Sequence, residues 1–257
     1  MAQAAAVEEQ RQAVAGLTRL ASAELASVME SLAGEPADVV LDALMEVLPA
    51  LGETYGDAAS VLAADYFDEA RVAAEVRGRF EATPSRGPER ARWEALARWG
   101  TDPLRPALQV PAVDDDGGPI NYERRRPDRK AALTLLDGGL TRSIADRHRL
   151  TIVENSIQDP QARGWVRIAR PGACGFCRML ADRVGSGGEP GVYTAASATF
   201  KSHDHCGCVA APSWDRTARV VSDVPFAYSD RKSDWSDERK ARENRRVYEY
   251  LAEHYGD

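Results

Sequence analysis

The residues best suited to chemistry are four cysteines and two histidines between positions 174 and 208. A Cys-x-x-Cys pair is followed, after 25 residues, by the pattern His-x-His-Cys-x-Cys. Cysteines separated by two residues form a tight turn that can hold one ion, and zinc takes four ligands in a tetrahedron with Zn–S near ~2.3 Å. The candidate ligands are Cys174, Cys177, His203, His205, Cys206 and Cys208. This pattern of cysteines and histidines predicts a zinc site. Because six candidates are available for four coordination positions, the pattern does not decide which four residues bind.

Two other interpretations of the cysteines stay open, namely reduced thiols buried in a core and one or two disulfides. A disulfide needs an oxidising compartment, and nothing in the sequence indicates export. A zinc held by four protein ligands would be structural, because a catalytic zinc keeps one coordination position open. Zinc deaminases carry Pro-Cys-x-x-Cys and a His-x-Glu, whereas Ala173 precedes Cys174 here and no His-x-Glu lies upstream.

No catalytic residue is assigned from the rest of the sequence. It contains no Gly-x-Ser-x-Gly elbow, no phosphate-binding loop and no dinucleotide fingerprint. His148 lies among arginines and is expected to be solvated on a helix surface.

The elements expected before the motif are helices. Apolar residues recur every three or four positions, which predicts amphipathic helices. Pro36 stands near the start of the second helix, and Pro49 is expected to end it. The expected helices span residues 4–33, 36–48, 53–81, 89–99 and 128–158, the last with a candidate interruption at Gly138-Gly139.

The texture of the chain changes at Gly164. Residues 165–170 alternate apolar and basic side chains, as a half-buried strand does. Further short strands are expected at 192–194 and 209–212, and a charged helix at 235–255. The predicted fold class is therefore α+β: a mostly α-helical N-terminal region, a small α+β module with a Cys/His zinc knuckle, and a C-terminal helix.

Five prolines and an Asp-Asp-Asp-Gly-Gly run indicate a linker or long loop between the helical region and the module. The predicted division is a helical region at 1–100, the linker at 101–127, the module with the Cys/His cluster at 128–215, and a tail at 216–257. Residues 1–100 hold 9 basic and 17 acidic side chains, whereas the remainder is nearly neutral.

The whole-chain composition excludes some functions. Hydrophobic residues at 44%, charged residues at 28% and a net charge of −7 are typical of a globular protein and not of a basic nucleic-acid binder. No apolar run approaches the ~20 residues that cross a bilayer, so no membrane partner is expected. A basic cluster is either a solvated or protein-facing surface or a contact for nucleic-acid phosphate. Its members are Arg124, Arg125, Arg126, Arg129 and Lys130.

Three stretches carry a resemblance to a known family. They are residues 164–183 with the Cys-x-x-Cys, Val192-Tyr193, and the closing cluster at 203–208; a helical stretch at 54–71 adds to them. Together they resemble the MuF-like minor head proteins of tailed bacteriophages, in the form found in phages and prophages of actinobacteria. The resemblance covers most of residues 40–212, and the C-terminal motif is its specific part.

The resemblance implies a virion protein near the portal vertex that acts in head morphogenesis. It is assembled in the bacterial host cytoplasm, with the portal or major capsid protein as partner and phage DNA as a further contact. Family members are often called capsid maturation proteases, so a protease that cleaves scaffold or capsid protein is the alternative function. The sequence shows no nucleophile paired with a base to support it.

The resemblance also orders the candidate ligands. The family's His-x-x-Cys-x-Cys matches His203, Cys206 and Cys208, which ranks His205 last. The metal ligands that we expect are Cys174, Cys177, His203, Cys206 and Cys208, around a structural zinc ion.

Overall fold

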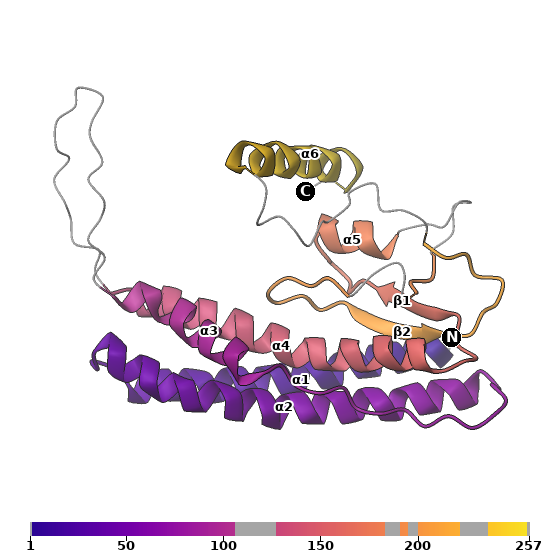
Figure 1. Ribbon diagram of the computed structural model, residues 1–257, viewed down its shortest axis with the longest axis horizontal. Helices are drawn as coiled ribbons and strands as arrows, with labels where there is room; N and C mark the ends of the chain where they lie inside the picture. Colours follow the sequence, from indigo (N-terminus) through magenta and orange to yellow (C-terminus); the bar gives the residue numbers. More distant parts are fainter. Residues whose placement is uncertain (1, 106–126, 183–190, 195–199, 222–235, 256–257) are drawn as a thin grey trace.

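Four helices form the elongated body of the computed structural model, which describes residues 2–105, 127–182, 191–194, 200–221 and 236–255. They are α1 (Ala2–Ser31), α2 (Ala37–Ala73), α3 (Arg90–Thr101) and α4 (Arg129–Gln158). The three long helices run side by side, and the shorter α3 lies along α2 and α4 (Figure 1). A 3-10 turn at Asp102–Leu104 follows α3.

One hydrophobic core joins α4 to the other three helices. Leu25 of α1, Leu44 of α2, Trp93 of α3 and Leu136 of α4 are all buried in it. The segment before the expected linker and the helix after it therefore share a core. Most of that linker, residues 106–126, lies outside the described residues.

The expected break at Pro49 is wrong, because α2 continues through it to Ala73. A proline inside a helix has no N–H for the carbonyl oxygen four residues earlier. Here that oxygen belongs to Met45, and Arg90 donates to it from Nη2 at 3.4 Å while contacting Glu46 Oε1 at 2.5 Å. A side chain of α3 thus supplies a donor where the helix lacks one.

The end of α2 was expected near residue 81 and lies instead at Ala73. Arg71, which is 7% exposed, donates to the carbonyl oxygens of Arg77 at 3.2 Å and Gly78 at 2.9 Å. Its Nε also pairs with Asp159 Oδ2 at 3.0 Å. The backbone turns sharply at Gly78, where φ is 89°. A buried guanidinium therefore organises the turn that ends the helix.

The candidate interruption at Gly138-Gly139 is wrong as well, since α4 is continuous there. A Cβ on Gly139 would lie 2.3 Å from Leu96 Cδ1 on α3. The glycine lets the two helices approach closely, and this packing outweighs its poor helix propensity.

The segment between α2 and α3 is fixed to α4 by buried polar side chains. Asn155 accepts a hydrogen bond from the backbone N–H of Thr83 at 2.9 Å and donates to its carbonyl oxygen at 2.8 Å. Ser85 donates to the carbonyl oxygen of Arg147 at 3.0 Å, and its own carbonyl oxygen accepts from the Arg147 guanidinium at 2.7 Å. Backbone groups of Thr83 and Ser85, which lie outside the helices and strands, thereby find hydrogen-bond partners.

A two-stranded antiparallel sheet lies against the bundle. It consists of β1 (Gly164–Ile168) and β2 (Val209–Ser213), with Gly164 opposite Ser213 and Ile168 opposite Val209. The predicted positions of these two strands are confirmed. The prediction of a strand at 192–194 is wrong, because Tyr193 forms only an isolated bridge with Trp165.

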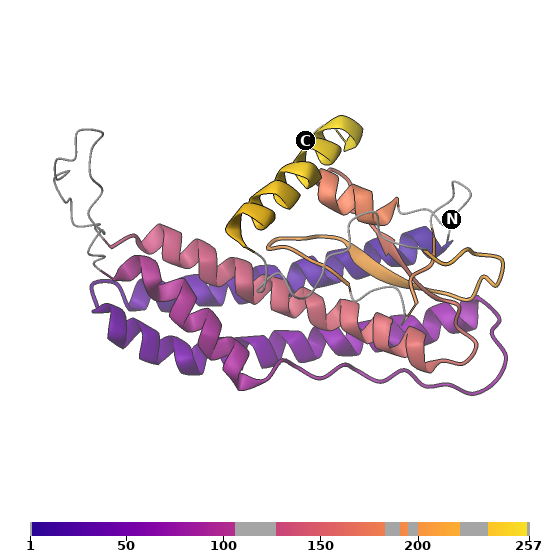
Figure 2. The ribbon, with the colours of Figure 1, turned by 45° about the horizontal axis from the view of Figure 1, so that its top comes forward.

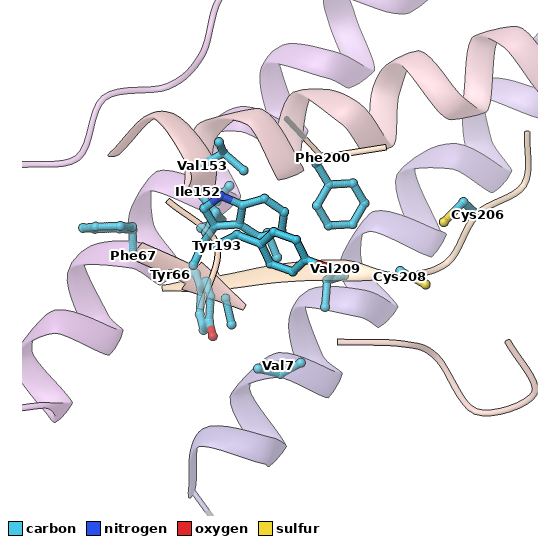
Figure 3. Packing of buried hydrophobic residues seen from close by; sticks show 14 of the residues in the cluster. Val7, Tyr66, Phe67, Ile152, Val153, Tyr193, Phe200, Cys206, Cys208 and Val209 are labelled. Carbon is cyan, nitrogen blue, oxygen red and sulfur yellow. The ribbon is translucent and has the colours of Figure 1, made fainter. Parts of the chain in front are cut away.

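A second core lies between the sheet and the helices. Trp165 stacks on Tyr193 with ring centroids 4.5 Å apart, and Phe200 also packs on Trp165 at 5.5 Å. Phe67 of α2 and Ile152 of α4 belong to the same cluster (Figure 3). The sheet is therefore part of the helical body and not an appendage.

Two further helices lie beyond the sheet. The first, α5 (Gly175–Ala181), follows β1, and the charged α6 (Asp237–Tyr255) packs on it (Figure 2). Met179 and Leu180 of α5 meet Leu251 of α6, and Arg178 donates to the carbonyl oxygen of Tyr255. The expected α+β class, mostly helical with a small sheet and a C-terminal helix, is confirmed.

The close contact between Gly52 of α2 and Trp93 of α3 gives a stability prediction. A Cβ on Gly52 would lie 2.1 Å from Cζ2 of the indole ring, which is 2% exposed and tightly packed. We expect Gly52→Ala to lower the free energy of unfolding by about 1–3 kcal/mol, despite alanine's better helix propensity. Urea denaturation measures the change.

The matched control is Gly16→Ala on α1, where a Cβ meets nothing within 4 Å. This variant should raise the free energy of unfolding by up to ~1 kcal/mol. A Gly52→Ala protein that gains as much as the control would contradict the close packing of α2 on α3.

Candidate metal centre

Pairing of the two strands brings the two parts of the Cys/His motif together. Ile168 ends β1 opposite Val209, which begins β2. The segment after β1 and the segment before β2 therefore start from the same end of the sheet. Cys174 is the N-cap residue of α5, and Cys177 lies in its first turn. The His/Cys segment at 203–208 leads directly into β2.

All five expected ligands fall into two overlapping groups. The ligand atoms of Cys174, Cys177 and His203 lie within 4.8 Å of one another, and so do the sulfurs of Cys177, Cys206 and Cys208. His203 Nε2 is 3.4 Å from Cys174 Sγ and 3.2 Å from Cys177 Sγ. Cys177 Sγ is 3.6 Å from Cys206 Sγ. Tetrahedral ligands around zinc are ~3.7 Å apart when Zn–S is ~2.3 Å, so these groups could hold a metal ion.

The centre is buried on one side and open on the other. Cys177, Cys206 and Cys208 are buried, whereas Cys174 and His203 are exposed. Figure 3 shows Cys206 and Cys208 at the edge of the cluster that contains Phe200. All four cysteines are free thiols, so the disulfide interpretation finds no support.

His205 is directed away from both groups. Its backbone has a φ of 58°, and its Nδ1 lies 4.0 Å from Asp137 Oδ2. Among the described residues, neither group of candidate ligands includes it. This position agrees with its last rank among the expected ligands.

Arg167 of β1 is the first functional residue that the sequence did not reveal. Its Nη2 lies 3.5 Å from Cys177 Sγ and 3.6 Å from Cys206 Sγ, and its Nη1 donates to the carbonyl oxygen of Lys201 at 2.6 Å. The residue is 5% exposed, so the expected alternation of buried apolar and solvated basic residues along this strand is wrong. The guanidinium can compensate negative charge on two thiolates.

Arg149 of α4 is the second. It donates from Nε to the carbonyl oxygen of Cys208 at 2.9 Å and from Nη2 to that of Cys206. It also pairs with Asp146 Oδ1 at 2.7 Å. The cysteine segment is thereby attached to the long helix through its backbone.

The cluster shifts the acidity of its own members. Hydrogen bonds from Cys177 and Cys208, with the charge of Arg149 nearby, lower the pKa of the Cys206 thiol. The hydrogen bond that Cys177 gives to Cys206 raises the pKa of Cys177. Burial opposes the charge on Arg167, but the neighbouring sulfurs of Cys208, Cys206 and Cys177 outweigh it and raise the pKa of the guanidinium.

A family model described as VG15 protein matches residues 1–231, which hold the four-helix body, both strands and the whole Cys/His cluster. The chain belongs to the VG15 protein family. This membership makes it a viral protein of the phage type. No curated protein and no solved structure matches this VG15 family member.

Within the described part of this VG15 family member, no helix has the length and apolar character needed to cross a bilayer.

His148 corrects another expectation, because it is 1% exposed and not solvated. Its Nε2 lies 3.2 Å from Gln10 Oε1. Burial, with the neighbouring charge of Arg149, lowers the pKa of His148 to about 4. The basic residues around His148 did not indicate that α1 and the cysteine segment cover the face of α4 on which it lies.

Arg167 offers a test of the centre in this VG15 family member. We expect Arg167→Met to weaken metal binding by about 10–100-fold, because the group that contacts two sulfurs is lost. The methionine chain preserves much of the apolar contact with Phe200. Competition titration with zinc and a chromophoric chelator measures the affinity.

Arg167→Lys is the matched control, since it keeps a positive charge in the same place and should lose less affinity than the methionine variant. Equal affinities in the wild type and both variants would show that the guanidinium does not act on the sulfurs.

Proposed function

We propose that this VG15 family member is a structural minor capsid protein of a tailed phage, acting in head morphogenesis, with one structural zinc ion in its Cys/His cluster. The observation that carries the proposal is that two groups of candidate ligand atoms share Cys177: one also holds Cys174 and His203, and the other also holds Cys206 and Cys208. A closed site of this kind stabilises a fold and leaves no position for a substrate.

The proposed ligands are Cys174, Cys177, His203 and Cys206. Successive contacts of 3.4, 3.2 and 3.6 Å join these four side chains. Arg167 lies against Cys177 and Cys206, as expected for a donor to metal-bound thiolates. Cys208 remains a buried neighbour of both sulfurs, and Arg149 holds its carbonyl oxygen.

Zinc would tie two short segments to the rigid body. Neither α5 nor the segment at 200–208 is long enough to be stable alone. One ion bound to both would fix them at the end of the sheet, and metal binding to such small units is coupled to their folding.

The assignment to a phage head is supported by the viral family and by the resemblance to MuF-like minor head proteins. In this proposal the protein resides in the virion near the portal, with the portal or major capsid protein as partner. Contact with phage DNA has a narrower basis. Arg129 of the basic cluster donates to the carbonyl oxygens of Met29 and Leu32, both at 2.8 Å, and so caps the end of α1. Residues 124–126 lie outside the described residues.

We expect purified protein to contain one zinc equivalent per chain by elemental analysis. Cys177→Ser should lose the metal, because Cys177 belongs to both groups of ligands. Hydrogen exchange should then increase in α5 and at 200–208 while α1, α2 and α4 stay protected.

Two controls define the ligand set. Cys206→Ser should lose the zinc, whereas Cys208→Ser and His205→Ala should keep it. A wild-type protein without metal would refute the zinc proposal, and loss of zinc from Cys208→Ser but not from Cys206→Ser would refute the set of four.

The location has its own experiment. Co-expression with the portal and major capsid proteins of the same phage should yield heads that contain this chain, seen by gel analysis and at the portal vertex by cryo-electron microscopy. Heads that form normally and never contain the chain would contradict the assembly role.

One contact favours a second candidate function, a capsid maturation protease. The exposed Cys174 lies 3.4 Å from His203 Nε2, and His203 Nδ1 lies 2.7 Å from the carbonyl oxygen of Asp204. A thiol beside an oriented imidazole is the pair that cysteine proteases use. The sequence placed both residues among the expected metal ligands and did not indicate them as a nucleophile and its base.

Zinc binding and cleavage would use the same atoms, so they respond in opposite ways to a chelator. Incubation with capsid and scaffold protein should give no cleavage, with or without chelator, if the cluster is structural. Cleavage that appears on chelation and disappears in Cys174→Ala would establish the protease instead.

A further inference from the structure

A cavity lies between α1, α4 and the segment at 205–209, and it borders the proposed metal position through Cys206. Its volume is about 360 Å³, within the range of small-ligand sites. Five arginines line it, from all three of its sides, against one carboxylate, that of Asp137. The arginines are Arg11, Arg19, Arg142, Arg149 and Arg170.

Three of these arginines already have carboxylate partners. Arg11 pairs with Glu8, Arg142 with Asp204 at 3.0 Å, and Arg149 with Asp146 at 2.7 Å. The charges of these three arginines are therefore balanced within the protein. The other two guanidinium groups remain to attract an anionic ligand.

Arg19 and Arg170 are the two whose charge is not balanced. Arg19 donates to the carbonyl oxygen of Ala15 in its own helix at 3.2 Å. Neither side chain has a carboxylate partner within the described part of the chain, and both are exposed at the cavity. They approach from different elements, Arg19 from α1 and Arg170 from the segment after β1.

A second, independent observation concerns the buried end of the cavity. His148 lines it and is 1% exposed, yet its Nδ1 has no hydrogen-bond partner among the described residues. Nε of Arg11, also in the lining, is likewise buried without a partner. Buried polar groups are nearly always satisfied in proteins, so these atoms indicate a cavity whose polar capacity the protein does not fill by itself.

We propose that this cavity is a binding site for a phosphate group. Guanidinium groups match pairs of phosphate oxygens. Donors that approach from separate elements suit a tetrahedral anion, which presents oxygens in several directions, better than a planar carboxylate. The site borders the Cys/His cluster along residues 205–208, which include the proposed metal ligand Cys206, but it requires none of the sulfurs as ligands.

The test is isothermal titration of the full chain, as purified, with inorganic phosphate at low ionic strength. The wild type should bind one equivalent. The double variant Arg19→Gln with Arg170→Gln should bind at least about tenfold more weakly, because two charge-assisted contacts are lost. Both side chains are exposed, so the variant should keep its circular dichroism and its metal content.

Arg92→Gln is the matched control, since Arg92 is an exposed helical arginine outside the cavity. It should bind phosphate as the wild type does. No binding by the wild type, unchanged binding by the double variant, or equal affinity for acetate and phosphate would each overturn the proposal.

A second titration distinguishes the sources of the phosphate. A single-stranded oligonucleotide that competes with inorganic phosphate, and that the double variant fails to bind, identifies a polynucleotide backbone. Competition by small phosphate monoesters but not by the oligonucleotide identifies a free phosphorylated molecule. Metal content measured on the same samples separates either result from a change at the cysteines.

Discussion

Two buried guanidinium groups hold the functional end of this protein together. Arg149 comes from α4 and Arg167 from β1, and they lie on Phe200 at 5.1 and 4.2 Å from the ring centroid. A buried cation is costly unless charge and hydrogen bonds compensate it. Here Asp146 compensates Arg149 and Cys177 contacts Arg167, and carbonyl oxygens and a sulfur of the segment before β2 supply the other contacts. The conformation of that segment, and with it the arrangement of the cysteines, therefore depends on two residues outside the Cys/His motif.

The helical body holds the elements that carry these two arginines in place. Arg149 is anchored in a helix that packs on three others, and β2 rests on α1, α2 and α4. The polar bonds of Asn155 and Ser85 fix the neighbouring chain to the same helix. The helical body thus supports the Cys/His cluster but contributes none of its candidate ligands.

The sequence predicted those features that depend on local pattern. Most of the helices and the positions of the two strands followed from periodicity, the spacing indicated six candidate ligands, and the family resemblance ordered them. Several of the expectations that were wrong involve a distant partner. Pro49 is accommodated by Arg90 of another helix, and Gly139 is packed against Leu96. Neither partner can be identified from the local window around the proline or the glycine.

The candidate site shows the same division between local and distant information. Spacing alone favours a metal, but the closeness of Cys177 to Cys206 needs the register of β1 on β2. Arg167 looked like a solvated residue in an alternating strand, because its buried surroundings belong to segments far along the chain.

The packing of α6 on α5 has a consequence for communication through the molecule. The first turn of α5 carries Cys177, and its apolar face receives Leu251 of the last helix. A macromolecule that binds α6 therefore binds a helix that packs on α5, and α5 carries one sulfur of the cluster. By thermodynamic reciprocity, if a metal ion at the sulfurs changes the affinity of α6 for the macromolecule, then the bound macromolecule changes the affinity of the sulfurs for the metal by the same factor. Binding at the C-terminal helix and binding at the cysteines can therefore influence each other.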